Sequence, residues 1–448
     1  MSDKLRTLTE ALLSAAQKAG ATAADTMAVD GTAISVDVRQ GRLEQAERAD
    51  GIEIGLRVLI GQRQASVSAS DTSARTIAEM AERAVAMARE APTDDSIGLA
   101  DPDQLARGWD LAALELSDPA ADPAAADLES DARRAEGAAL AVKGISQVDS
   151  ASASYSRRRI HIAMSNGFSG GYERSSRSIS AVAITGEGLH MERDWAAESR
   201  AFQADLPAPE DIGRLAAERT LERAGPRKPR TGAFPVIFDE RVAASLIGHI
   251  LGATNGASIV RGASWLRDAL GTQILPQGLN IAEDPHRPRL SGSRPFDAEG
   301  LATFSRNIVE DGVLTGWTLD LGTARRLGLQ STASATRGTS GPPGPGNGNI
   351  RLTQGPKSRA ELIADMGTGL LVTSFLGASV NPTTGGYSRG AAGFWVAGGQ
   401  IAYPVNECTI AGNLRDMVRR ITPANDARTH LPHVVPSLLV EGLTLAGD

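Results

Sequence analysis

The sequence predicts an α+β fold, with an N-terminal domain of helices and antiparallel strands and a β-rich C-terminal domain. An order of helix, strands and helix occurs twice in the first 225 residues, a segment rich in proline and glycine follows, and short strand-like runs fill most of the rest. A chain of 448 residues, 41% of them hydrophobic, is long enough for about two or three domains. We therefore expect an N-terminal domain at 1–224, a linker at 225–232 and a C-terminal domain at 233–448.

The first unit combines two amphipathic helices with a meander of strands. Leucines recur at helical spacing from Leu5 to Leu13, and Gly20 ends this helix. A second helix begins at the capping residues 71–73 and runs to about Ala91. Between the helices, alternating apolar residues predict strands at 35–39, 51–60 and 64–70.

The second unit repeats this order without a visible repeat of sequence. Helical spacing predicts one helix at 122–142 and another at 210–223. Four β-like runs lie between them, at 147–155, 159–164, 177–185 and 189–200. A duplicated α+β unit is therefore suggested by element order alone.

The segment A-G-P-R-K-P-R-T-G at 224–232 divides the chain. Its prolines, glycines and basic residues are typical of an exposed linker, and it lacks the aromatic residues of a nucleic-acid site. Beyond it, glycine turns at 311–312, 381–386 and 398–399 separate short strands. A loop at 340–349, S-G-P-P-G-P-G-N-G-N, contains too much proline and glycine for regular structure.

The C-terminal domain opens with a helix at 239–256, D-E-R-V-A-A-S-L-I-G-H-I-L-G-A-T-N-G. Its apolar residues recur at three- and four-residue steps, Asp239 can cap its start, and Asn255-Gly256 can end it. His249 lies within this apolar pattern. A single histidine there is more often a core residue than a metal ligand, because a metal site needs several convergent donors.

Composition narrows the classes of function. A net charge of −7 argues against binding to nucleic acid or to an acidic membrane surface. A single cysteine, Cys408, forbids an intramolecular disulfide, and the first residues lack the apolar core of a signal peptide. Without about 18 continuous apolar residues, a transmembrane helix is not expected either. We expect a soluble, cytoplasmic protein.

Several short motifs can be weighed against ordinary structural roles. G-F-S-G-G at 167–171 matches a serine-hydrolase pattern, but a strand follows it where a nucleophile elbow needs a helix, so a glycine turn is favoured. Cys408 lies in a strand-like run, where a thiol usually packs as a small apolar group. A zinc site built from His249, His430 and His433 is a weaker alternative, since no pattern of carboxylates or thiolates accompanies them.

Resemblance to a known family rests on four C-terminal stretches and two N-terminal ones. The C-terminal stretches are P-V-I-F-D-E-R-V-A-A-S-L-I-G-H-I-L-G-A, A-S-I-V-R-G-A-S-W-L-R-D, N-P-T-T-G-G-Y-S-R-G-A-A-G-F-W-V and T-I-A-G-N-L-R-D-M, and the N-terminal ones are the run at 51–71 and S-N-G-F at 165–168. They closely resemble the TldD/PmbA family, and within it the PmbA, or TldE, branch. The resemblance covers nearly the whole chain.

The resemblance implies a zinc metallopeptidase made of two subunits. In the family, the TldD branch carries an HExxxH helix that binds zinc, and TldE is its partner in a heterodimer. Aligning that motif with the helix places its second histidine on His249, its first on Ala244 and its glutamate on Ser245. Neither an alanine nor a serine can hold zinc or act as the general base, and the family's cysteine ligand is also absent from 422–436. Cys408 is not expected to replace it.

The sequence therefore predicts a catalytically silent subunit without catalytic, cofactor or metal residues of its own, whose partner holds the zinc. Unfolded peptides are the implied substrate, and a homodimer can form when the partner is absent. We expect the helix to be regular and His249 to be hydrogen-bonded internally. Two alternatives stay open: a self-sufficient metallohydrolase that uses His249 with other ligands, and a non-enzymatic modulator of DNA gyrase, which is the family's older name.

Overall fold

The N-terminal part of the molecule is one curved, six-stranded antiparallel sheet. A computed structural model describes residues 3–447, except for the side chain of Ala378. The strand order β3-β2-β1-β4-β5-β6 is symmetric about the central β1–β4 pair, as expected for two similar three-stranded units joined side by side. The strands are β1 (Ala23–Arg39), β2 (Arg42–Ile60), β3 (Arg63–Ala69), β4 (Ile145–Met164), β5 (Ser169–Thr185) and β6 (Glu192–Arg200).

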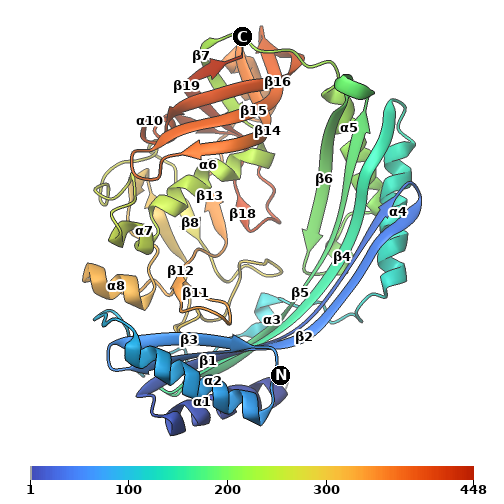
Figure 1. The fold of residues 1–448 in the computed structure, drawn as a ribbon. Helices are drawn as coiled ribbons and strands as arrows, with labels where there is room; N and C mark the ends of the chain where they lie inside the picture. Colours follow the sequence, from blue (N-terminus) through green and yellow to red (C-terminus); the bar gives the residue numbers. More distant parts are fainter. Residues whose placement is uncertain (1–2, 448) are drawn as a thin grey trace.

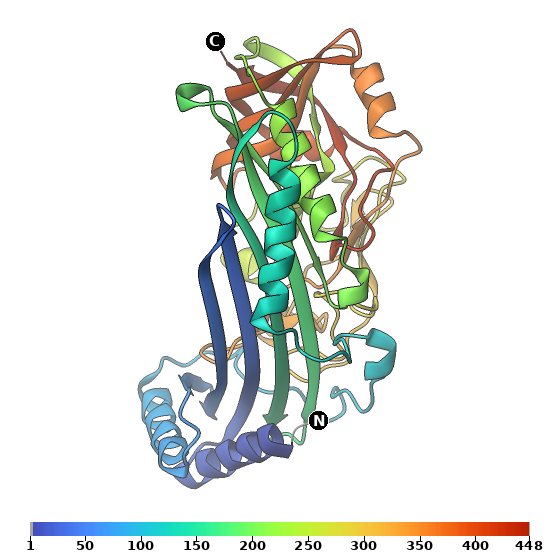
Figure 2. The same cartoon turned by 90° about the vertical axis from the view of Figure 1, so that its right-hand side faces the viewer.

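Four long helices pack on one face of this sheet (Figure 2). Ala24 and Ala28 of β1 contact the first pair of helices, and Ile34 and Val36 of the same strand contact the second pair. All four are even-numbered residues, so both pairs lie on the same face of the strand. The helices are α1 (Asp3–Ala19), α2 (Ala74–Glu90), α4 (Ala125–Leu140) and α5 (Pro209–Glu222), and the short elements are α3 (Leu111–Leu114), η1 (Gly188–His190) and η2 (Gln203–Asp205).

The strands are longer than the sequence predicts. β1 begins at Ala23 instead of residue 35, β2 begins at Arg42 instead of residue 51, and β4 joins two predicted strands into one. The cause is that residues 42–51 are exposed on both faces, while their backbone remains paired with β1. In β4, Arg157, Arg158 and Arg159 interrupt the apolar alternation, but the pairing with β1 and β5 continues through them.

The C-terminal part is built around a sheet that closes on itself. The strands follow the order β16-β15-β14-β7-β19-β17, and β16 also pairs with β19. β7 and the helix α6 (Glu240–Ala253) that follows it contribute to the largest apolar core, together with β14 and β19. The strands are β7 (Gly232–Phe238), β14 (Gly369–Val380), β15 (Gly386–Ala397), β16 (Gln400–Asn413), β17 (Ile421–Pro423) and β19 (Leu438–Ala446).

A second, smaller sheet lies between this closed sheet and the N-terminal sheet (Figure 1). Its strand order is β10-β9-β8-β13-β18, and β11 and β12 form a separate pair. The strands are β8 (Ile281–Glu283), β9 (Arg306–Glu310), β10 (Val313–Leu314), β11 (Ala335–Thr336), β12 (Gly344–Pro345), β13 (Ile350–Leu352) and β18 (His433–Val434), and the helices are α6 (Glu240–Ala253), α7 (Gly256–Val260), α8 (Leu321–Leu327), α9 (Arg359–Met366) and α10 (Leu414–Val418). The predicted β-rich character is confirmed.

All three predicted glycine turns connect neighbouring strands, and the one at 381–386 joins β14 to β15. Gly312 lies between β9 and β10, and Gly398 and Gly399 lie between β15 and β16. These three glycines have positive φ, at 79°, 61° and 74°, where glycine avoids the steric cost of a side chain. Within residues 3–447, no helix is long and apolar enough to cross a membrane.

Candidate functional site

A large cavity, of about 820 Å³, lies between the two halves of the chain. Its N-terminal wall is the face of β4, β5 and β6 that is turned away from the helices, and Figure 1 shows these strands curving past the C-terminal half. The opposite wall consists of the first turns of α6, the loop at 289–291 and the segment at 428–433. Because both halves supply walls, the cavity exists only in the assembled fold.

Helix α6 begins as the sequence predicts. The carboxylate of Asp239 accepts a hydrogen bond from the backbone N–H of Arg241 at 3.2 Å, and Ala243, Leu246 and Ile250 are buried. The predicted end is wrong, because α6 stops at Ala253. Asn255 instead caps α7 by accepting a hydrogen bond from the N–H of Ala257, so the chain turns into a second short helix.

Ala244 lies on a different face of α6 from the other two positions of the degenerate motif, Ser245 and His249, which are four residues apart. Ala244 lines the large cavity, and the hydroxyl of Ser245 donates a hydrogen bond to the carbonyl of Val242 at 2.6 Å. His249 points elsewhere, against the ring of Tyr387, with 5.8 Å between the ring centroids. The helix is α-helical from Glu240 to Ala253, as predicted, and a five-residue step in such a helix rotates about 140° around the axis.

The predicted internal hydrogen bond of His249 is wrong for its Nε2 atom. That atom is buried and has no hydrogen-bond partner among the described residues. Burial, and secondly the positive charge of Arg389, lower the pKa of His249. Both effects favour the neutral form of the ring, which packs edge-on against the ring of Tyr387.

The other two histidines of the alternative zinc site lie at the cavity. His430 and His433 both line it, whereas His249 does not. His430 contacts Glu198 at 3.4 Å and Arg428 at 3.2 Å, and its pKa is lowered by burial first and by Arg200 second. Among residues 3–447, no group of three or more His, Cys, Asp or Glu side chains is arranged to hold a metal ion. The structure does not bring the three histidines together.

Arg241 fixes the start of α6 against the N-terminal sheet. Its guanidinium bonds to Asp239 at 3.1 Å and to Asp194 of β6 at 3.3 Å. Burial by itself would lower the pKa of Arg241, but the two carboxylates outweigh it and raise the pKa. Arg223 lies 3.7 Å from the same Asp194 carboxylate. These buried ion pairs couple the two walls of the cavity.

Polar residues on β4 and β5 form the N-terminal wall of the large cavity. The sequence did not predict that these residues form a site. Ser176, Ser178 and Ser180 alternate with buried residues of β5, and Ser156 and Arg158 face the same side from β4. The available signal was the two-residue period of serines, which we read only as evidence for a strand. Their common face becomes visible only once the strand pairing is known.

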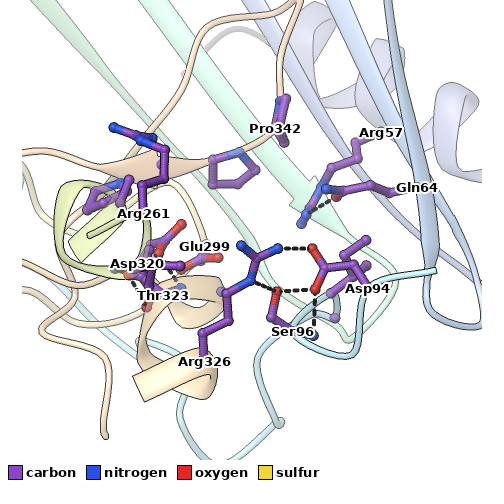
Figure 3. A pocket seen from close by; sticks show the side chains of 18 residues that line it. Arg57, Gln64, Asp94, Ser96, Arg261, Glu299, Asp320, Thr323, Arg326 and Pro342 are labelled. Atoms are coloured by element: carbon purple, nitrogen blue, oxygen red, sulfur yellow. Dashed lines mark hydrogen bonds and ion pairs between the residues drawn. The ribbon is translucent and has the colours of Figure 1, made fainter. Parts of the chain in front are cut away.

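A second cavity, of about 290 Å³, lies where the first N-terminal unit meets the C-terminal half (Figure 3). Arg326 forms an ion pair with Asp94 and donates a hydrogen bond to Ser96 at 3.0 Å. Glu299 is buried there, and burial followed by the charges of Asp297 and Asp320 raises its pKa well above the usual value. The predicted irregular loop at 340–349 forms one side of this cavity and contains only the two-residue strand β12. These polar groups mainly connect the two halves.

The remaining motifs have the structural roles that we favoured. Cys408 is 4% exposed, its Sγ donates to the carbonyl of Ala391 at 3.1 Å, and burial raises its pKa to about 11. Gly167 has a φ of 99° in the turn before β5, and Ser169 is the first residue of that strand. No helix follows the serine, so the G-F-S-G-G motif is a turn and not a nucleophile elbow.

Comparisons with known proteins cover nearly all of this architecture. Three family models match in chain order: the PmbA/TldA metallopeptidase domain 1 at residues 24–88, the central domain at 118–224 and the C-terminal domain at 231–447. The first two ranges correspond to the two halves of the N-terminal sheet, and the third contains α6 and the closed C-terminal sheet.

Individual proteins agree with the models. The chain is 40% identical to Metalloprotease PmbA of Escherichia coli O157:H7 over 93% of this chain and 90% of that protein. It is 36% identical to the Metalloprotease PmbA homolog of Haemophilus influenzae, over 97% of this chain and 94% of that protein. Both matches extend across the two halves of the fold.

Solved structures have the same fold. A crystal structure of a candidate modulator of DNA gyrase from Bacteroides thetaiotaomicron aligns over 100% of both chains, with a TM-score of 0.92 and 27% identity. TldE from Thermococcus kodakarensis aligns over 98% of this chain and 100% of its own, with a TM-score of 0.85, and its 19% identity supports the fold alone. With three matching domain models and a 40% identical relative along nearly its full length, the chain belongs to the PmbA/TldD metallopeptidase family, in its PmbA/TldE branch.

Proposed function

We propose that this chain is a catalytically silent subunit of a two-part zinc metallopeptidase that acts on unfolded peptides. Its partner is a TldD-like subunit that carries an intact HExxxH helix and holds the zinc ion. One observation carries the proposal: Ala244, at the position of the motif's first histidine, forms part of the wall of the large cavity. The cavity is retained, while the group that should face it is missing.

The residues present on α6 do not fit a zinc ion. A catalytic zinc site needs about three N, O or S donors from the protein and one open position for water. Ala244 offers no donor, and the hydroxyl of Ser245 is bonded to the carbonyl of Val242. His249 lies on a different face from Ala244, against Tyr387. No hydrolytic step is therefore assigned to this chain.

Two strand edges at the cavity support a role in holding peptide. β6 is the last strand of the N-terminal sheet, and β18 is the last strand of the smaller C-terminal sheet. Residues 198–200 of β6 and His433 of β18 line the cavity. An extended peptide can add to such an edge through backbone hydrogen bonds, which need no particular sequence. Folded proteins lack a free strand to offer, so unfolded substrates are favoured.

Coexpression with the organism's HExxxH-bearing relative tests this proposal. We expect the two chains to copurify and to cleave an unstructured peptide in a zinc-dependent way, while this chain alone is inactive. Ala244→Arg, which fills the cavity wall, should abolish cleavage without preventing copurification. Gly252→Arg is the matched control, because Gly252 is exposed on the same helix and has open space around it. Chelator-sensitive cleavage by this chain alone would overturn the proposal.

The oligomeric state is part of the same proposal. Related subunits that share an interface can form a homodimer when the partner is absent. Light scattering of the purified chain, before and after addition of the TldD-like subunit, should show a self-dimer replaced by a heterodimer. A monomer that ignores the second subunit would contradict the two-part enzyme.

A further inference from the structure

The wall of the large cavity that is formed by β4, β5 and β6 carries small hydroxyl side chains in register. Ser154 pairs with Ser178, and Ser178 pairs with Ser199 on the next strand. The hydroxyls of Ser154 and Ser178 are 2.7 Å apart, and those of Ser176 and Ser199 are 3.0 Å apart. Because these side chains are short, the wall leaves room for a chain laid across it and offers that chain hydrogen bonds.

The charge of the cavity is opposite to the charge of the whole protein. Seven arginines and two glutamates line the cavity, although the chain has a net charge of −7. Four of the arginines form ion pairs with carboxylates of the protein. The other three, Arg158, Arg174 and Arg219, have no carboxylate within 4.0 Å in the described part of the chain. A concave site of one charge sign concentrates ligands of the other sign.

Arg158 and Arg174 are direct neighbours across β4 and β5. Like charges at directly opposite positions destabilise a sheet, so this pair costs stability unless an anion is bound nearby. Arg174 donates to the carbonyls of Ser291 and Ser293, at 2.6 and 3.0 Å, which fixes its side chain. Its Nε atom is buried without a partner among residues 3–447. Arg158 is exposed and carries the freer guanidinium.

Arg219 provides a cation from the helix side of the same cavity. Its guanidinium donates to the carbonyl of Trp195 at 3.2 Å, and burial followed by the charge of Arg241 lowers its pKa. The only glutamate of the lining outside an ion pair is Glu240, whose pKa is raised, first by burial. The unpaired charge around the cavity is therefore mainly positive.

We propose that this cavity selects acidic segments of unfolded peptides, with the carboxylates of the bound segment placed against Arg158 and Arg174. The inference rests on the proposed function and adds a substrate class to it. In an extended peptide, every second side chain points to the same face, at a spacing of about 7 Å. An Asp or Glu at alternate positions can thus reach the arginine pair while the backbone contacts the serines.

Peptide binding to the full-length chain, alone and in complex with the TldD-like subunit, tests the inference. Two fluorescent 12-residue peptides of glycine and serine are compared by anisotropy, one with four aspartates and one with four lysines at the same positions. At low salt the acidic peptide should bind about tenfold more tightly, and the difference should shrink as salt is added. Arg158→Ala should weaken binding of the acidic peptide by about threefold to tenfold and leave the basic peptide unchanged.

Arg159→Ala is the matched control on the same strand. Arg159 points to the opposite face, is bonded to Glu173 at 2.6 Å and does not line the cavity. It should change the affinity less than about twofold, as expected for a rim charge outside the site. Equal affinity for both peptides, or equal effects of the two variants, would overturn acidic selection and leave the proposed function intact. Absence of binding to either peptide, by the chain and by the complex, would overturn both.

Discussion

Asp25 is the residue whose replacement tests the connection between the two halves of the molecule. It lies on β1, where its side chain is fully buried, and it forms ion pairs with Arg57 of β2 and Arg337 of the C-terminal half. Arg57 donates from Nε at 2.6 Å, and Arg337 donates from Nη1. Burial by itself would raise the pKa of Asp25, but the two guanidiniums outweigh it and lower the pKa.

The expected cost of Asp25→Asn follows from what the substitution leaves behind. Both arginines are nearly or fully buried, with side-chain exposures of 6% and 0%. Removing one partner of a buried ion pair costs about 3–5 kcal/mol, because the remaining charge stays in a poorly solvated place. Asparagine keeps one acceptor oxygen, so we expect a value near 3 kcal/mol. This is a large share of a typical stability of about 5–15 kcal/mol.

Urea unfolding, monitored by tryptophan fluorescence, measures the loss of unfolding free energy. Amide hydrogen exchange shows which segments are destabilised. The rate of amide hydrogen exchange should rise in residues 23–27 and in residues 335–339, which lie on the two sides of the ion pair between Asp25 and Arg337. Asp30→Asn is the control on the same strand, because Asp30 pairs with Arg159 at 3.6 Å, and this partly exposed ion pair is worth about 1 kcal/mol or less. Since the folded pKa of Asp25 is lowered, its contribution is complete at neutral pH and is lost as the pH falls through the acid range. Equal losses of unfolding free energy in Asp25→Asn and Asp30→Asn would refute the stabilising role of the buried ion pairs of Asp25.

Two further predictions concern histidines. The double variant Ala244→His with Ser245→Glu should not create a zinc site, because in a regular α6 the new histidine lies about 140° around the helix from His249. Elemental analysis of the purified variant measures its zinc content, and one zinc ion per chain would contradict this prediction. Burial, and secondly Arg6, lower the pKa of His161, so the unfolded state takes up a proton more readily and stability should fall as the pH drops below about 6.5. Urea midpoints at pH 7.5 and 5.5 should differ less in His161→Leu than in the parent chain, and an unchanged difference would assign the effect to other groups.

Local signals predicted the start of α6 but not its surroundings. The cap at Asp239 and the apolar spacing are properties of neighbouring residues, and both are confirmed. The environment of His249 depends on Tyr387 of β15, which packs against the helix from a distant part of the sequence. Spacing within one helix cannot identify such a partner. For this reason the spacing placed His249 on the helix but did not reveal its contact with Tyr387, and the predicted hydrogen bond failed at Nε2.

The large cavity could not be predicted, for a similar reason. The period of two in β5 indicates a strand, but it does not say which neighbour supplies the facing side chains. Only the pairing of β4 with β5 places Arg158 beside Arg174. The exposed first half of β2 was missed because hydrogen bonds to β1 maintain it without an apolar side-chain pattern. The composition of this site therefore follows mainly from the pairing of strands, which the local sequence pattern does not specify.

Helix α6 has a structural role that does not depend on a metal ion. Its buried face holds Leu246 and Ile250 in the C-terminal core, and Arg241 at its start bonds to Asp194 of the N-terminal sheet. Unfolding α6 would remove these contacts and open the cavity between the two halves. Ala244 lines the cavity and also packs, partly buried, against the edge of the same core. These contacts hold α6 in place without a metal ion, so the helix can remain folded in the silent subunit that we propose.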